Sequence, residues 1–174
     1  MRSLKAFVLV LLVGCGDLKF DENNPTSPNA PPPGSSTLLG SLSAMLDNEQ
    51  FNAPLQTPAT WRNDNFGFTV ISALAGLTRM VSISIHTAGP VTAVVGGIPS
   101  PSVSLNESVD GINWLHWGAS SRQGAGSVTL SFLTTESASG YFSVELIPDS
   151  ATKAAGYTTT RYLTGGNFNV SVSR

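Results

Sequence analysis

The stretch SVTLSF, residues 127–132, alternates polar and apolar side chains over its whole length. Val128, Leu130 and Phe132 should project to one side of an extended chain, because successive side chains of a strand point to opposite faces. This period of two predicts a half-buried β-strand. The same alternation recurs from residue 38 to the C-terminus and is interrupted by turn-forming clusters.

Comparable runs predict the other strands, and a turn over residues 47–50 separates the first of them from Phe51. Sustained helical periodicity is missing from the sequence, and only residues 150–156 could form a short turn of helix. The inward-facing residues of the predicted strands are expected to be Leu42, Ala44, Leu46, Phe66, Phe68, Val70, Val81, Ile83, Ile85, Phe142, Val144, Leu146, Phe168, Val170 and Val172. We expect the core to include Val81, Ile83, Val128, Leu130, Phe142, Val144, Phe168 and Val170.

The fold class follows from this pattern together with the composition. Only 11% of the 174 residues are charged, against roughly 25% in ordinary domains. We predict an all-β domain over residues 38–174, an antiparallel β-sandwich of about eight to ten strands. A closed or partly open β-barrel is the alternative. The sandwich is favoured because several runs contain or adjoin prolines, which suit exposed edges: Pro54, Pro58, Pro90, Pro99 and Pro101.

The N-terminal segment, residues 1–14, is typical of an export signal. Arg2 and Lys5 precede an apolar run over residues 6–13. As a helix this run would reach only ~12 Å, against a ~30 Å hydrocarbon core, so it is too short to span a membrane. Residues 12–15, LVGC, resemble the lipobox of bacterial lipoproteins. An ordinary secretory signal with an incidental cysteine is the alternative.

The lipobox resemblance implies that Cys15 becomes the lipidated N-terminus of the mature protein. A diacylglyceryl group would be attached to its sulfur and the freed amine would be acylated, for example with palmitate. Several acyl chains on one residue give stable anchoring. We therefore expect a protein that is exported and lipid-anchored to the bacterial cell envelope. The outer membrane is favoured, with the domain facing the periplasm or the surface, and the inner membrane is the alternative. Cys15 is the only cysteine, so no disulfide is expected.

Residues 15–37 contain PTSPNAPPPGSS and almost nothing that could pack. Such a composition cannot bury enough apolar surface to offset its chain entropy. We predict a flexible, disordered linker between the anchor and the domain. A proline-rich ligand for a partner groove is the alternative.

Four motifs of the domain resemble a group of small β-rich envelope lipoproteins of Gram-negative bacteria that are classed as domains of unknown function. The motifs are LSAMLDNEQFNA (42–53), GSVTLSF (126–132), ASGYFSVEL (138–146) and TGGNFNVSV (164–172). The chain departs from that group at Asn48, where a turn glycine often stands, and in carrying Trp114 and Trp117. The resemblance implies a fold class and a location, and no mechanism.

Candidate chemistry is sparse. The chain has 9 basic and 11 acidic residues, so it lacks the positive charge that nucleic-acid binding requires. His86 and His116 lie far apart in sequence and have no second ligand at near spacing, so no metal and no cofactor is expected. A hydrolase that uses His86 or His116 with a serine and an aspartate is the alternative function, although no G-x-S-x-G motif is present.

The segment INWLHW, residues 112–117, carries the most informative candidates. On a strand, Trp114 and His116 would share one face, and Leu115 and Trp117 the other. One indole should then be exposed, as in proteins that stack sugars, or be covered by a loop. Trp61 could extend such a patch. We therefore expect a non-catalytic binding or structural module whose partner is a glycan or an envelope protein, with Trp61, Trp114, His116 and Trp117 as candidate ligand-binding residues.

Overall fold

The structure is a computed structural model that describes residues 39–74 and 76–174, apart from the side chain of Leu74. The predicted signal peptide (1–14), the lipidation site Cys15 and the predicted linker (15–37) lie outside the described residues. The described part of the chain contains eleven strands and one short helix. In chain order these are β1 (Gly40–Leu46), β2 (Glu49–Pro54), β3 (Ala59–Arg62), β4 (Asn65–Leu74), β5 (Leu77–His86), β6 (Val91–Val94), β7 (Ser102–Ser108), β8 (Leu115–Ala119), β9 (Ala125–Leu133), β10 (Ser137–Pro148), α1 (Ser150–Ala154) and β11 (Arg161–Ser173).

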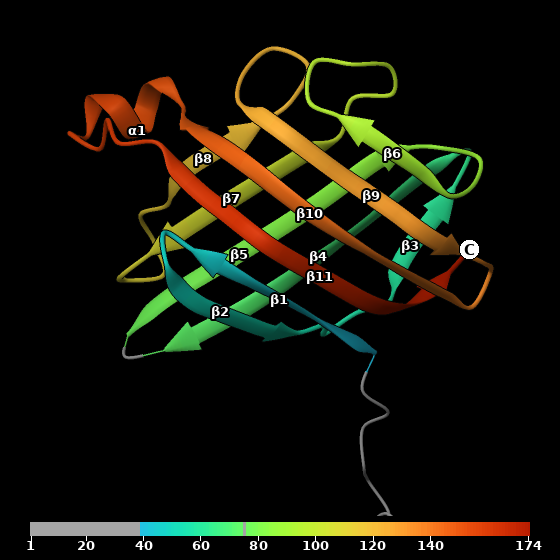
Figure 1. Cartoon of the computed structure of the whole chain (residues 1–174). Coiled ribbons are helices and arrows are strands. Elements are labelled where there is room, and N and C mark those ends of the chain that lie inside the picture. Colours follow the sequence, from blue (N-terminus) through green and yellow to red (C-terminus); the bar gives the residue numbers. More distant parts are fainter. Residues whose placement is uncertain (1–38, 75) are drawn as a thin grey trace, which may run out of the picture. The chain divides into compact units, whose positions relative to one another are not determined.

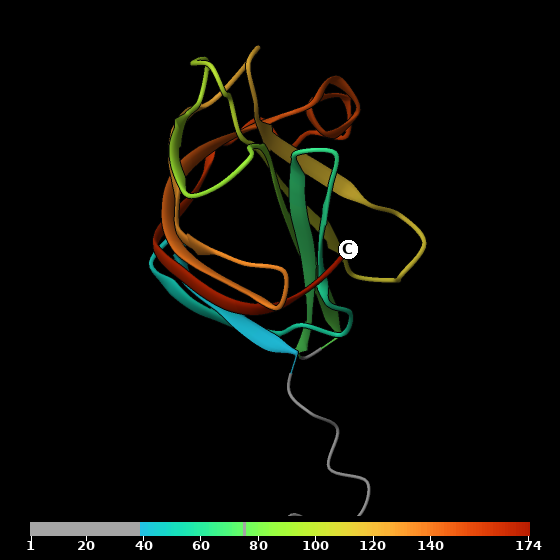
Figure 2. The same cartoon turned by 90° about the vertical axis from the view of Figure 1, so that its right-hand side faces the viewer.

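The strands form two layers, with sheet A in front of sheet B in Figure 1 and the two layers side by side in Figure 2. Sheet A has the order β2-β1-β11-β10-β9-β6, and sheet B has the order β3-β4-β5-β7-β8. The long strands β10 and β11 join the layers, because the end of β10 pairs with β8 and the end of β11 pairs with β3. Strands β2 and β6 remain free edges of sheet A. The fold is therefore a β-sandwich with two shared strands and not a closed barrel.

The predicted fold class is confirmed, with two differences in detail. The described strands number eleven, one more than the upper end of the expected range. The pairing of β3 with β11 is parallel, whereas the other described strand pairs are antiparallel. Both differences arise from short segments at the corners of the sandwich, where alternation over four residues is too brief to predict a strand.

The core lies between the two sheets. All eight residues predicted for it are buried. Phe66 and Phe68 of sheet B meet Phe168 of sheet A, and the ring centroids of Phe68 and Phe168 are 5.0 Å apart. This aromatic cluster joins the layers at their centre, and burial of such rings is a dominant stabilising contribution.

The prediction that Phe132 faces the core is wrong, because β9 contains a β-bulge. Leu130 pairs with Gly140, but Phe132 pairs with Ser139, so Ser131 is an extra residue on β9. One extra residue transfers all later side chains to the opposite face. Phe132 is consequently 50% exposed and Leu133 takes the buried position.

The turns are built from residues that tolerate left-handed backbone conformations. Asp47 and Asn48 have φ values of 49° and 73° and form a two-residue connection between β1 and β2. The turn is thus shorter than the expected 47–50, and Glu49 already belongs to β2. Asparagine and aspartate tolerate positive φ better than other non-glycine residues, which explains why Asn48 can replace the glycine usual in such turns.

The helical turn predicted at 150–156 is confirmed as α1. Asp149 caps it, accepting a hydrogen bond of 2.7 Å from the backbone N–H of Thr152. Among the described helices, none is both long enough and apolar enough to cross a membrane.

Candidate functional site

One end of the sandwich, on the left in Figure 1, gathers α1, the β1–β2 turn and the β7–β8 loop. Two cavities of about 640 and 480 Å³ open there and share Leu77 as a wall residue. The first cavity lies between β2 and the ends of β4 and β5, and the second lies beneath the β7–β8 loop. We refer to the two cavities together as the end groove. Concave regions of this size are the usual place to look for a ligand site.

A cluster of five charged residues, from almost fully buried to exposed, adjoins the end groove, and Glu49, Arg79 and Glu107 line its cavities. Glu107 of β7 is almost fully buried and accepts hydrogen bonds from Arg79 Nε at 2.8 Å and from Arg161 Nη1 and Nη2 at 2.7 and 3.1 Å. The guanidinium of Arg79 also contacts the Glu49 carboxylate at 3.5 Å, and that of Arg161 contacts the Asp47 carboxylate. We call these five residues the charge cluster. Glu107 is thereby paired with both guanidiniums, but the cluster as a whole has three carboxylates for two guanidiniums, and its exposed carboxylate is that of Glu49.

The charge cluster was not predicted from the sequence, although one signal for it is present. Arg79 stands two residues from the buried Val81 in β5, and Glu107 stands two residues from the buried Leu105 in β7. Both charged side chains therefore point to the inner face of sheet B. The two residues are direct cross-strand partners. Opposite charges on the inner faces of two strands indicate a buried ion pair, but only the strand register shows that these two side chains meet.

Trp117, a predicted ligand-binding residue, belongs to the core. Its indole Nε1 donates to the carbonyl oxygen of Thr159 at 3.0 Å. The guanidinium of Arg161 lies 5.2 Å from the indole ring, and Tyr157 meets that ring edge-on. Trp117 therefore connects the charge cluster to the core and does not present its ring to a ligand.

Trp114 does not lie on the strand as expected, because β8 begins at Leu115. It belongs to the β7–β8 loop, which we define as residues 109–114. The loop places three apolar side chains at the surface: Val109 is 80% exposed, Ile112 82% and Trp114 43%. Of the two indoles in the INWLHW segment, Trp114 is thus the accessible one and Trp117 the buried one.

The conformation of the loop is set by Asp110. Its carboxylate accepts hydrogen bonds from the backbone N–H groups of Asn113 (2.7 Å) and Ile112 (2.9 Å) and from Ser108 Oγ (3.1 Å). These bonds, above all those from the backbone of Asn113 and Ile112, hold the pKa of Asp110 well below its usual value of 3.8. The ionised carboxylate therefore orders the loop at neutral pH, and this contribution is lost only as the pH falls below that usual value.

His116 lies on β8, and its Nδ1 is 3.5 Å from Asp149 Oδ2. The backbone N–H of Thr152 is the main reason that the pKa of Asp149 is lowered, and His116 adds to the effect. His86 lies on β5, where its Nδ1 contacts the Asn65 side chain at 3.2 Å. Within residues 39–74 and 76–174, neither imidazole is hydrogen-bonded to a hydroxyl group, and no cluster of His, Cys, Asp and Glu is placed to hold a metal ion.

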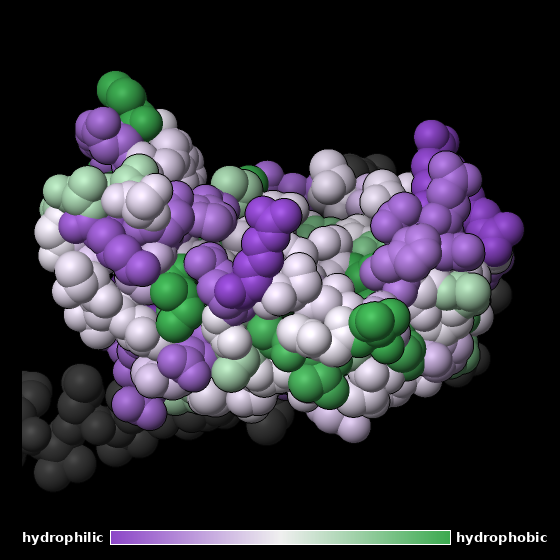
Figure 3. Space-filling model, turned by 90° about the horizontal axis from the view of Figure 1, so that it is seen from above, coloured by the Kyte–Doolittle hydropathy of each residue, from purple (hydrophilic) through white to green (hydrophobic). Residues whose placement is uncertain are grey.

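Trp61 lies apart from the other candidates, in β3 at the right of Figure 1. Its indole Nε1 donates to the carbonyl oxygen of Thr87 at 3.1 Å, and the Arg174 guanidinium lies 4.8 Å from the ring. Arg62, Asn63 and Asp64 complete a cavity beside it. Seen from above, strongly hydrophilic residues gather at this end of the domain (Figure 3). Trp61 therefore does not extend a patch around Trp114.

The end groove combines paired charges with apolar walls. Leu77, Leu115 and Tyr157 line its second cavity, next to the exposed loop 109–114. The apolar walls of this second cavity suit an uncharged or apolar group of a ligand. No protein-family model, curated protein or solved structure matches the chain.

Proposed function

We propose that this protein is a lipid-anchored, non-catalytic binding module of the bacterial cell envelope, held at the outer membrane through Cys15. Its partner would be an envelope protein or a glycan. The observation that supports this best is loop 109–114, an ordered loop that exposes Val109, Ile112 and Trp114 beside the end groove. Single exposed apolar residues are common on protein surfaces, but three on one ordered loop are typical of a contact surface.

Replacing Trp114 with alanine tests the binding role. Detergent-solubilised whole protein is applied to arrays of envelope polysaccharides and to immobilised envelope proteins, and bound protein is quantified. We expect Trp114→Ala to weaken retention about tenfold or more, because large aromatic residues contribute most to contact surfaces. The thermal midpoint should change little, since the indole is partly solvated already.

Ile98→Ala is the matched control. Ile98 is a fully exposed apolar residue on the β6–β7 loop, which contributes no residue to the end groove. This variant should bind like the wild type. Equal retention of the Trp114→Ala and wild-type proteins would remove loop 109–114 from the proposed function.

Replacing Cys15 with serine tests the anchor. A serine oxygen cannot take the diacylglyceryl group that the lipobox resemblance implies, so the protein should leave the membrane fraction almost completely. Cell fractionation and intact-mass measurement of the wild type and the variant give the answer. The anchor would be contradicted if the wild type carried no added acyl mass and the Cys15→Ser variant stayed in the membrane fraction.

A hydrolase is the second candidate, and the 3.5 Å contact between His116 and Asp149 is the observation that favours it. A base held by a carboxylate is part of many hydrolytic sites, and the contact with a nucleophile can tighten when substrate binds. If the whole protein hydrolyses a chromogenic ester and His116→Gln abolishes this activity, the proposal of a non-catalytic module is contradicted and the hydrolase is supported.

A further inference from the structure

The outer face of sheet A is almost free of charge. Strand alternation and register place every second side chain of its six strands on the solvent side, apart from the bulges, and Glu145 is the one charged residue among those described. Serine, threonine and asparagine predominate among the rest. We call this surface the sheet A face. Its residues on the four inner strands include Ser41, Ser43, Thr129, Ser139, Tyr141 and Asn167.

One row of these side chains crosses all six strands in register. The successive cross-strand partners are Asn52, Ser43, Asn167, Tyr141, Thr129 and Thr92. At ~4.8 Å between strands the row is about 24 Å long. Ser43 Oγ donates to Asn167 Oδ1 at 3.0 Å, which leaves the Asn167 Nδ2 group without a hydrogen-bond partner in the described structure. The hydroxyls of Thr92 and Thr129 are 3.1 Å apart. The row is thus an ordered array of donors and acceptors.

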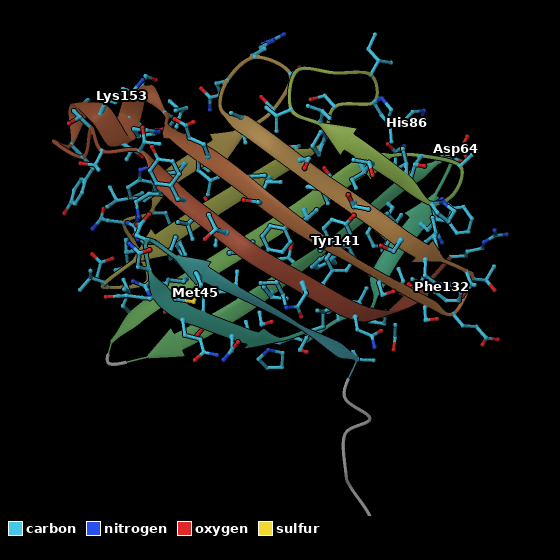
Figure 4. The ribbon with its side chains drawn as sticks, viewed as in Figure 1. Met45, Asp64, His86, Phe132, Tyr141 and Lys153 are labelled. Carbon is cyan, nitrogen blue, oxygen red and sulfur yellow. The ribbon has the colours of Figure 1, made fainter. Side chains whose placement is uncertain are left out.

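Exposed aromatic rings accompany the row. Tyr141 is 58% exposed at the middle of the sheet A face, and Phe132 lies on the same face toward the end of β9 (Figure 4). Tyr162, which is 49% exposed, borders a shallow depression of about 200 Å³ whose wall includes Ser143, Glu145 and Thr164. The bulge that transfers Phe132 outward therefore adds a ring to this surface.

Sheet B provides an internal comparison. Among the described residues, the large hydrophobic or aromatic side chains that are exposed lie on sheet A or on loops, and none lies on a strand of sheet B. Both sheets carry hydroxyl groups, as expected for a chain so poor in charge. The combination of hydroxyls and amides with exposed aromatic rings is specific to the sheet A face.

We propose that the sheet A face binds a neutral, extended polysaccharide, with Tyr141 as its central contact. An aromatic ring packs on the apolar C–H face of a sugar, while neighbouring amides and hydroxyls exchange hydrogen bonds with the sugar hydroxyls. A nucleic acid or an acidic polymer would require a cationic surface instead. The inference rests on the proposed role as a binding module, but it uses a surface separate from loop 109–114.

The test uses whole protein in detergent and four immobilised polymers. Cellulose, chitin and dextran are neutral, and alginate is the acidic comparison. We expect retention on at least one neutral polymer and none on alginate. Retention should be the same at about 0.05 and about 0.5 M salt, because salt screens only charged contacts. Retention on alginate alone, or on none of the four polymers, overturns the inference.

Five variants then locate the surface on the polymer that binds. Tyr141→Ala should lower retention about tenfold or more, whereas Tyr141→Phe should keep most of it because the ring remains. Asn167→Asp should also lower retention, because it removes the free amide donor and adds a charge. Tyr157→Ala reports on the other candidate surface, because Tyr157 is exposed to a similar degree but lines the end groove. Ile98→Ala, which lies outside both surfaces, is the control and should bind like the wild type. Thermal midpoints within a few degrees of the wild type show that all five variants fold.

The outcomes separate this inference from the proposed function. Loss of retention in Tyr141→Ala but not in Trp114→Ala or Tyr157→Ala supports the sheet A face. Loss in Trp114→Ala or Tyr157→Ala with Tyr141→Ala unaffected overturns it and leaves the binding module, with its site at the end groove. If Tyr141→Ala, Trp114→Ala and Tyr157→Ala are all retained as strongly as the wild type, both surfaces are overturned as binding sites.

Discussion

Replacing Phe142 with alanine is expected to lower the free energy of unfolding by about 3–5 kcal/mol, the usual cost of truncating a buried aromatic ring. Phe142 is only 2% exposed, and its ring lies over Gly166 of the neighbouring strand. Gly166 leaves the space that the ring fills, because a Cβ at that position would collide with it. Truncation would therefore leave a cavity between β10 and β11, which the backbone cannot easily close. Urea unfolding followed by circular dichroism measures the loss.

Tyr141→Ala is the control for this prediction. Tyr141 precedes Phe142 in β10 but points to the opposite side of the sheet, where it is exposed. Its truncation should cost less than about 1 kcal/mol, the range of strand propensities. Similar losses in the two variants would contradict the assignment of Phe142 to the core.

Replacing Glu107 with glutamine is expected to cost about 3 kcal/mol. The change leaves the half-buried guanidiniums of Arg79 and Arg161 without the carboxylate between them, and removing one partner of a buried ion pair costs about 3–5 kcal/mol. We expect the low end of that range because both arginines are partly exposed and keep contacts with Glu49 and Asp47. Denaturant unfolding of the variant gives the value.

Glu49→Gln is the matched control, since Glu49 is also bonded to Arg79 but its side chain is 73% exposed. Pairs of this kind contribute roughly 0–1 kcal/mol. If Glu107→Gln were as mild as Glu49→Gln, the charge cluster would be a set of ordinary surface pairs. A double variant, Glu107→Gln with Arg79→Met, should lose less than the sum of the single changes, because the two residues are in contact.

The core could be predicted residue by residue because it depends on a local rule. Alternation with a period of two assigned all eight expected core residues correctly, among them Val81, Val128 and Phe168. The rule failed at Phe132, where a bulge adds one residue to β9 and reverses the alternation. Nothing in the SVTLSF stretch itself indicates the bulge, which is defined by the pairing of β9 with β10.

The candidate site was predicted less well because it is made by neighbours that are distant in sequence. Trp114 and Trp117 were expected on opposite faces of one strand, but β8 begins after Trp114. The charge cluster joins Asp47 and Glu49 to Arg79, Glu107 and Arg161, which come from five different strands or turns. Trp61 looked equally suitable in sequence but lies in a separate cavity.

The sequence by itself determined the class of the fold, the inward side of most strands, the sites of the turns and the short helical turn after residue 149. Each of these depends on side-chain alternation, backbone preference or hydrogen bonds between residues a few positions apart. The tertiary structure alone decided the order of strands in the two sheets, the reversal at Phe132 and the burial of Trp117. It also brought Arg79, Glu107 and Arg161 together, and it aligned Asn52, Asn167, Tyr141 and Thr129 in one row. These features depend on which strands pair and in which register, and that choice is made by the packing of the whole core.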